Sequence, residues 1–251
     1  MASPTLPVAS RRPRDVAASD RRFHLAAAVA AAVITVVGFS PTFFARPSTL
    51  PPLPSLVVLH GVVFTGWLVA YALQATLIAT KRRDLHRTLG YWFVGLGAAM
   101  VFLGLVTAVA GVRRGAGGAF DDDPRVVMVL PFFDFVLFAG FLAAGYAWRR
   151  SPEAHKRLML LATIDLIGPA IARMAMHSSR PLFSEHFPTW AFGGMMLFLA
   201  VASVYDLATR RRVHPAYLWG AFALTASGPL RFWIAGTAAW LAFVDWLLRW
   251  M

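Results

Sequence analysis

The chain has 251 residues, of which 58% are hydrophobic and only 14% are charged, against roughly 25% charged residues in an average soluble domain, which excludes an ordinary soluble protein. The formal net charge is +12, but Lys and Arg stand in short clusters between long apolar runs, which excludes nucleic-acid binding through one basic face. Cysteine is absent, so disulfides, iron–sulfur clusters, thiolate metal sites and thiol nucleophiles are also excluded.

Residues 1–22 are polar and rich in Pro, Ala and Arg, so we expect a disordered basic tail ahead of one helical domain, 23–251. A membrane-spanning helix needs about 20 mostly apolar residues. Seven stretches of the domain meet this requirement, at approximately 23–45, 55–80, 90–112, 126–148, 158–177, 189–208 and 216–248. The sequence therefore predicts an all-α polytopic membrane helix bundle with about seven transmembrane helices. A cleaved secretory signal is the alternative interpretation of the first stretch.

The last stretch is too long for one straight crossing of a bilayer. Ser227-Gly228-Pro229 lies within it, and proline removes a backbone donor and kinks a helix. We therefore expect the last helix to break near these three residues, with the main spanning part running from Pro229 to Trp250.

The basic residues predict an orientation. Most of the 24 Lys and Arg residues fall in the tail and in the loops after the second, fourth and sixth stretches. The positive-inside rule then places the N-terminus in the cytoplasm. The expected partners are the lipid bilayer and, at the basic loops, anionic lipid headgroups.

Three of the predicted inner loops, RRDLHRTLG, RRSPEAHKRLM and RRRVHPAYLWG, place arginines and a histidine before a new helix. His86, His155 and His214 are therefore expected near the N-terminal ends of the third, fifth and seventh helices. Helix N-termini and nearby arginines disfavour the imidazolium ion, so these histidines are predicted to be neutral. The alternative interpretation is that they only anchor the helices among lipid headgroups.

Other polar residues lie within the apolar stretches, where charges are expensive and therefore pair or line a cavity. In the second stretch, helical steps of 100° place His60 and Gln74 on one stripe that faces the bundle. By depth we expect an outer group and an inner group, with Asp165 on the fifth helix. The outer group comprises His60, Asp134, Arg173, His177 and Arg231, and the inner group comprises Gln74, His86, His155, Asp206 and His214.

Two interpretations of these buried groups remain open. The first is structural, with an Asp134–Arg173 ion pair and hydrogen bonds between helices. The second is a ligand, proton or cofactor site. No motif identifies a catalytic residue, and the HExxH pattern of zinc proteases is absent. We therefore predict no metal site other than haem iron.

The motifs LHGVVFTGW, LHRTLG, PFFD, EAHKRLMLLAT, PAIAR and YDLATRRRVHPAYLWG resemble a family of uncharacterised bacterial multi-pass integral membrane proteins. The resemblance runs from about Leu59 to the C-terminus and implies an inner-membrane protein, but it brings no activity. The chain is also similar to transmembrane b-type dihaem cytochromes, in which pairs of histidines from different helices hold haem. That similarity implies haem b, with His86 and His155 as the inner ligands and His60 and His177 as the outer ones.

Three functions are compatible with the sequence. A non-catalytic assembly, scaffold or sensor role is slightly favoured, because a basic inner surface can bind anionic lipid or a protein partner. A haem-binding electron carrier is the first alternative. A small-solute or proton-coupled transporter is the second, because a broken helix beside buried Asp, Arg and His residues is typical of transport sites.

Overall fold

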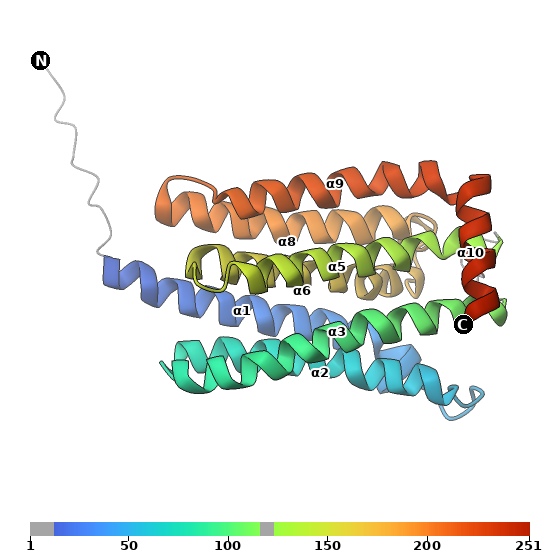
Figure 1. Cartoon of the computed structure of the whole chain (residues 1–251), viewed down its shortest axis with the longest axis horizontal. Helices are drawn as coiled ribbons and strands as arrows, with labels where there is room; N and C mark the ends of the chain where they lie inside the picture. The colour runs from blue at the N-terminus through green and yellow to red at the C-terminus, as the bar shows by residue number, and fades with distance from the viewer. Residues whose placement is uncertain (1–12, 116–122) are drawn as a thin grey trace, which may run out of the picture.

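The computed structural model describes residues 13–115 and 123–251, and within these ranges all regular structure is helical. The elements are α1 (Pro13–Phe39), the π-helical turn η1 (Ser40–Phe44), α2 (Ser55–Ala79), α3 (Arg83–Arg113), α4 (Pro124–Val127), α5 (Val129–Ala147), α6 (Pro152–Met176), α7 (Pro181–Ser184), α8 (Phe187–Arg210), α9 (Pro215–Ala235) and α10 (Ala238–Trp250). The long helices lie side by side along one axis (Figure 1), which confirms the predicted all-α bundle.

Six helical segments in the described ranges are long and apolar enough to cross a membrane: Val16–Phe44, Ser55–Ala79, Arg83–Arg113, Pro124–Ala147, Pro152–Met176 and Phe187–Arg210. They correspond to the first six predicted stretches. Large apolar side chains on their outward faces are exposed, including Val33, Val62, Phe102 and Leu197. Such surfaces are suited to contact with lipid, so the protein is a multi-pass membrane protein.

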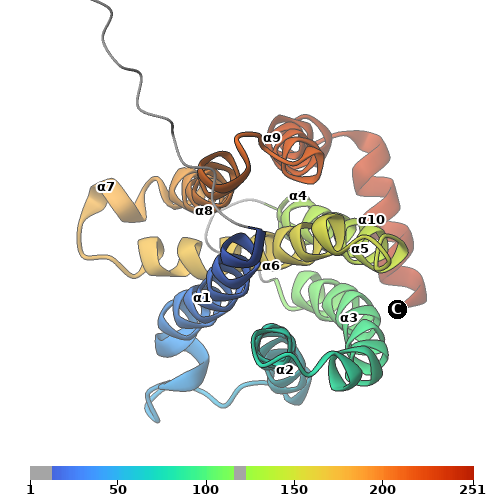
Figure 2. The ribbon, with the colours of Figure 1, turned by 90° about the vertical axis from the view of Figure 1, so that its left-hand side faces the viewer.

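Helix α6 lies at the centre of the bundle. In its most apolar window 56% of the residues are buried, compared with 17–28% in the other five segments. Figure 2 shows α6 surrounded by the other long helices when the bundle is viewed from one end. Polar side chains on the buried faces of α6 are therefore withdrawn from lipid, and they include Arg157 and Asp165.

The predicted break at Ser227-Gly228-Pro229 is wrong. Helix α9 continues through Pro229 and ends at Ala235, and Thr237 begins α10 by accepting the N–H of Trp240 on its hydroxyl oxygen. Proline removes one backbone hydrogen bond and crowds the carbonyl of the preceding turn, but the helix is not interrupted there, and α9 packs against both α5 and α6.

Helix α10 turns across the end of the bundle instead of completing a crossing (Figure 1). Trp240, Val244 and Leu247 form a buried cluster with side chains of α3 and α5. The indole N–H of Trp240 donates to the carbonyl oxygen of Arg125 at 2.8 Å, and the Arg125 guanidinium pairs with Asp245 at 3.1 Å. The stretch 216–248 is therefore divided into one long helix and a cap.

The opposite end of the bundle carries the start of α1 and the turns 80–82, 148–151 and 211–214, and we call it the basic end. Helix α1 begins at Pro13, ten residues before the predicted start of the helical domain. The remainder of the predicted tail, residues 1–12, lies outside the described residues. The additional helical turns at residues 13–22 bring Asp20 into contact with α6 and α8.

Candidate functional site

At the basic end, a buried ion pair joins α6 to α8. The guanidinium of Arg157 donates from Nε and Nη2 to the two carboxylate oxygens of Asp206, with an Nε–Oδ2 distance of 2.7 Å. The two side chains are 1% and 2% exposed. A planar guanidinium facing a carboxylate in this way makes two parallel hydrogen bonds, which fixes the relative position of the two helices.

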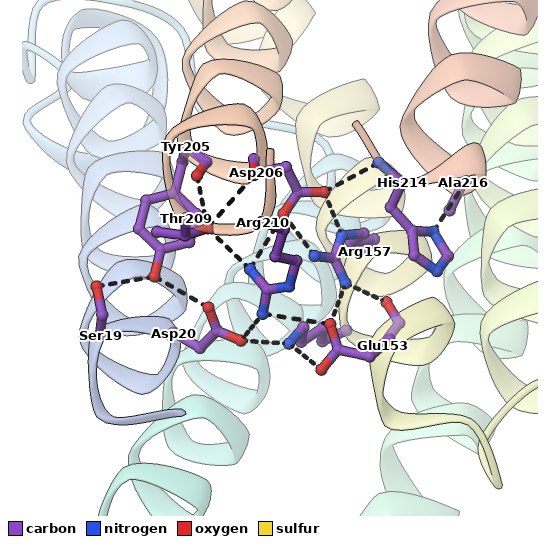
Figure 3. A network of polar contacts seen from close by, with 11 residues as sticks. Ser19, Asp20, Glu153, Arg157, Tyr205, Asp206, Thr209, Arg210, His214 and Ala216 are labelled. Atoms are coloured by element: carbon purple, nitrogen blue, oxygen red, sulfur yellow. Dashed lines mark hydrogen bonds and ion pairs between the residues drawn. The ribbon is translucent and has the colours of Figure 1, made fainter. Parts of the chain in front are cut away.

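A second set of charges surrounds this pair and fastens α1. Asp20 accepts from Arg210 and from Lys156, the latter at 2.5 Å. Glu153 accepts from Lys156 at 2.7 Å and from Arg157 at 2.8 Å. Figure 3 shows how the contacts link α1, α6 and α8 into one network. We call these residues, Asp20, Glu153, Lys156, Arg157, Asp206 and Arg210, the ionic network.

Hydroxyl groups extend the network along α1 and α8. The Tyr205 hydroxyl donates to Asp20 at 2.9 Å and lies at the same distance from the hydroxyl of Ser19. The ring of Tyr205 stacks on Phe23 with their centroids 4.0 Å apart. The beginning of α1 is therefore held by charge, hydrogen bonds and an aromatic contact, which explains why these turns are helical.

His214 occupies the predicted position at the start of α9. Its Nδ1 accepts the N–H of Ala216 at 3.1 Å, and its backbone N–H donates to Asp206 at 3.2 Å (Figure 3). Partial burial, and then the positive charge of Arg157, lower the pKa of His214 below its ordinary value of 6.5. The shift favours the neutral imidazole at pH 7.

The inner histidines His86 and His155 lie close together at the basic end, with ring centroids 6.1 Å apart. The Gln74 amide completes this group: with its oxygen accepting the Gly90 N–H, its nitrogen donates to the carbonyl oxygen and Nδ1 of His86. His155 Nδ1 lies 2.8 Å from the carbonyl oxygen of Gly145. A carbonyl only accepts, so Nδ1 carries a proton, and in the neutral tautomer with this contact the lone pair is on Nε2.

The fit of this pair to haem is partial. His155 has the hydrogen-bonding arrangement of an axial ligand, because a backbone carbonyl orients the ring through Nδ1. His86 receives the Gln74 amide on Nδ1, so its proton resides on Nε2. Coordination through that Nε2 requires the amide to turn and accept from Nδ1 instead. The residues therefore fit one bis-imidazole site at the basic end if Gln74 reverses.

The outer histidines do not form a matching pair. His60 stacks on Phe64 of its own helix at 4.0 Å, and His177 contacts the Arg173 carbonyl, also within its own helix, at 2.8 Å. Among the described residues they make no ring contact with each other. In the same ranges no group of three or more His, Cys, Asp or Glu side chains could hold a metal ion.

The predicted Asp134–Arg173 ion pair is wrong. Asp134 of α5 pairs with Arg231 of α9 at 2.6 Å, and the two side chains are 17% and 13% exposed. Arg173 instead donates to the Pro169 carbonyl at 3.2 Å and stacks on Phe39 at 4.3 Å. Depth alone cannot distinguish these two arginines, because α6 and α9 both pack against α5 and the choice depends on which of them turns its arginine towards Asp134.

Asp165 is the exceptional charge-bearing residue of the bundle. It is 0% exposed, and neither carboxyl oxygen has a hydrogen-bond partner among the described residues. At about 1.5 Å per residue it lies about 20 Å from Pro152 and about 17 Å from Met176, near the middle of α6. It interacts electrostatically with Asp134 and Arg231. We call Asp134, Asp165 and Arg231 the central group.

Sequence reasoning identified His214 beside the ionic network, but of the network itself it identified only Asp206. The missing signal is helical spacing. Glu153 precedes Lys156 and Arg157 by three and four residues, and Asp206 precedes Arg210 by four, which are spacings of neighbours on one helix face. Asp20 could not be found in this way, because both of its cationic partners are on other helices.

In comparisons with protein-family models, with curated proteins and with solved structures, the chain matches none. The features that bear on its activity are the ionic network, the histidine pair and the central group.

Proposed function

We propose that the protein is a proton-coupled carrier of a small solute, with the carboxyl group of Asp165 as the proton site. The observation that supports this function is the burial of Asp165 at the middle of the central helix without a hydrogen-bond partner. An isolated ionised carboxylate in such surroundings is several kcal/mol less favourable than a neutral one. Asp165 therefore carries a proton at rest.

The central group provides a reason for that proton to move. Arg231 is already paired with Asp134 at 2.6 Å. A change in helix packing that brings the guanidinium nearer to Asp165 stabilises its ionised form, and the proton is then released. Buried acids and arginines between packed helices are typical of proton relays in transporters.

The ionic network supplies the closed end of the proposed carrier. It holds α1, α6 and α8 together at the basic end, where Arg157 and Asp206 are almost completely buried. Alternating access requires contacts of this kind to open and close around a central site. We place the protein in a bacterial inner membrane, with the basic end facing the cytoplasm as the positive-inside rule requires. The ionic network then lies on the cytoplasmic side of the membrane.

Infrared spectroscopy of the purified protein in lipid tests the proton site directly. The carbonyl-stretch band of a protonated carboxyl group is expected in the wild type at pH 7 and should disappear in Asp165→Asn. Asp245→Asn is the matched control, because Asp245 is 45% exposed and paired with Arg125. If the wild type shows no such band, or if Asp165→Asn shows it with undiminished intensity, Asp165 is ionised and the proposal is rejected.

Transport itself is measured in liposomes that contain a pH-sensitive dye. A panel of small acids, amines and neutral solutes is added under an imposed pH gradient. Solute-dependent proton flux in the wild type and in Asp245→Asn, but not in Asp165→Asn, supports the carrier. If no solute in the panel moves protons but a protein partner co-purifies, the assembly, scaffold or sensor role is favoured instead.

The proximity of His86 and His155 favours a second candidate, a haem-binding electron carrier with one b-type haem at the basic end. Haem supplies one-electron transfer when it is bound, and His86 and His155 would hold it. Reduced-minus-oxidised spectra of haem-supplied protein test this function. A stoichiometric b-type band that is lost in His86→Ala and in His155→Ala, and kept in His24→Ala, supports it.

A further inference from the structure

A pocket at the basic end is lined by Glu153, Arg210, Arg212 and His214 and has a volume of about 500 Å³. It lies where the start of α6 meets the turn between α8 and α9, beside the ionic network. The pocket is open to the surface on one side, so it suits a small polar group and not a fully enclosed ligand. The pocket is distinct from the central group, whose Asp165 lies near the middle of α6.

The groups that line the pocket differ in whether they already have partners. Both carboxylate oxygens of Glu153 accept from cations: Oε1 from Lys156, and Oε2 from Arg157 and Arg210. Arg210 is also paired with Asp20. Glu153 and Arg210 are therefore largely committed to the ionic network and have little capacity for a ligand.

The remaining groups are donors. Arg212 has no hydrogen bond or ion pair within the described ranges, and its side chain is exposed. His214 uses Nδ1 to accept from the Ala216 N–H, so the neutral ring presents an N–H at Nε2. A ligand of this pocket must consequently supply acceptors to a guanidinium and an imidazole N–H.

The balance of charge also favours an anion. Lys156, Arg157, Arg210 and Arg212 carry four positive charges, and the acidic residues of the ionic network are Asp20, Glu153 and Asp206. One positive charge is therefore not neutralised. The positive end of the α9 dipole lies at His214 and adds to the attraction.

We propose that this pocket binds a phosphate group, with Arg212 and the Nε2–H of His214 as its donors. A guanidinium presents parallel N–H groups that match two oxygens of a phosphate, and a further oxygen remains for the imidazole. The phosphate belongs either to a phospholipid headgroup at the membrane interface or to a soluble phosphate compound. Both sources present the same oxygens to the pocket.

The test uses the full-length protein in detergent at constant ionic strength. Inorganic phosphate and a short-chain phosphatidylglycerol are titrated separately, and binding is followed by the rise in melting temperature and by calorimetry. Arg212→Ala removes the guanidinium. His214→Ser removes the imidazole donor but keeps a good N-cap residue for α9. Arg150→Ala is the control, because it removes an exposed arginine from another turn of the same end.

We expect at least one of the two probes to bind the wild type and Arg150→Ala equally, and to bind Arg212→Ala and His214→Ser at least tenfold more weakly. Binding of inorganic phosphate identifies a soluble ligand, whereas binding of the lipid alone identifies a headgroup. The proposal is overturned if neither probe binds, if either pocket variant binds like the wild type, or if Arg150→Ala is weakened equally. None of these readouts depends on proton uptake by Asp165, so the two proposals can fail separately.

Discussion

The two sets of buried charges in this bundle are neutralised in different ways. In the ionic network every carboxylate faces at least one cation, and Arg157 and Asp206 satisfy each other almost completely out of solvent. In the central group, Arg231 faces Asp134, whereas Asp165 has no hydrogen-bond partner in the described chain. Paired charges of the first kind hold helices together. An unpaired acid of the second kind contributes nothing evident to packing, which is why we assign it a function.

The largest expected effect tests the first half of this comparison. Arg157→Met should lower the free energy of unfolding by about 3–5 kcal/mol, because it leaves Asp206 buried without its main partner. Urea titration in mild detergent, followed by tryptophan fluorescence, measures the change. The double variant Arg157→Met, Asp206→Leu should recover most of the loss, since it removes both charges.

Asp165→Asn provides the contrast within the same helix. It strands no partner and keeps the shape of the side chain, so its free energy of unfolding should stay within about 1 kcal/mol of the wild type. Equal losses in Arg157→Met and Asp165→Asn would mean that the two regions do not differ as described.

The second prediction compares the two arginines that were candidates for pairing with Asp134. Breaking a fully buried ion pair lowers the free energy of unfolding by about 3–5 kcal/mol. Arg231→Met should lower it by somewhat less, because Asp134 and Arg231 are slightly exposed. Arg173→Met strands no carboxylate, and only its contacts with Phe39 and the Pro169 carbonyl are lost. In urea titrations, the free energy of unfolding of Arg231→Met should be clearly lower than that of Arg173→Met. The reverse order would contradict the observed pairing.

These comparisons also explain what could be predicted from the sequence. The bundle and its first six crossings follow from long apolar runs, because a bilayer imposes both length and composition on a spanning helix. The position of His214 at the start of α9 follows from local signals, chiefly the proline that comes after it. Such features depend on residues that are close in sequence, so the local sequence pattern is enough to predict them.

The wrong predictions all concern contacts between distant segments. The pairing of Asp134 depends on whether α6 or α9 presents its arginine, and the sequence does not specify the rotation of either helix. The continuity of α9 through Pro229 depends on its neighbours, and the end of the helix at Gly236-Thr237 depends on the docking of α10. Asp20 was assigned to a disordered tail, because its partners Lys156 and Arg210 lie far away in the chain.

The third prediction concerns the other contact between α1 and α6, which uses backbone packing in place of charge. A Cβ at Gly38 would lie 2.9 Å from the Cα of Ala170 and closer still to its carbonyl group. The backbone of α6 cannot shift without disturbing its own packing. Gly38→Ala should therefore lower the free energy of unfolding by about 1–3 kcal/mol.

Gly140→Ala is the matched control for Gly38→Ala. No atom lies within 4 Å of a Cβ at Gly140 in the middle of α5, so this variant should gain up to about 1 kcal/mol from the higher helix propensity of alanine. Thermal unfolding of both variants measures the difference. A Gly38→Ala variant that is as stable as Gly140→Ala would show that α1 and α6 are not in backbone contact.

The smallest expected effect is the dependence of stability on pH through His214, at the edge of the ionic network. Burial and the charge of Arg157 lower its pKa below 6.5 in the folded protein. As the pH falls below about 6.5, the unfolded chain therefore binds a proton on this residue more readily than the folded chain does. Protonation of His214 thus favours unfolding in mild acid, and no such contribution remains above neutral pH.

Comparison with His214→Ser isolates this contribution from those of the other titrating groups. Serine keeps an N-cap for α9 and does not titrate. The stability of the wild type relative to His214→Ser should therefore be greatest above pH 7 and should decline steadily towards pH 5 in thermal unfolding experiments. The opposite trend would mean that Asp206 and Glu153, which favour the imidazolium, outweigh burial and the cations Arg157 and Lys156 around this ring. In that case His214 belongs to the ionic network as a cation, like the arginines beside it.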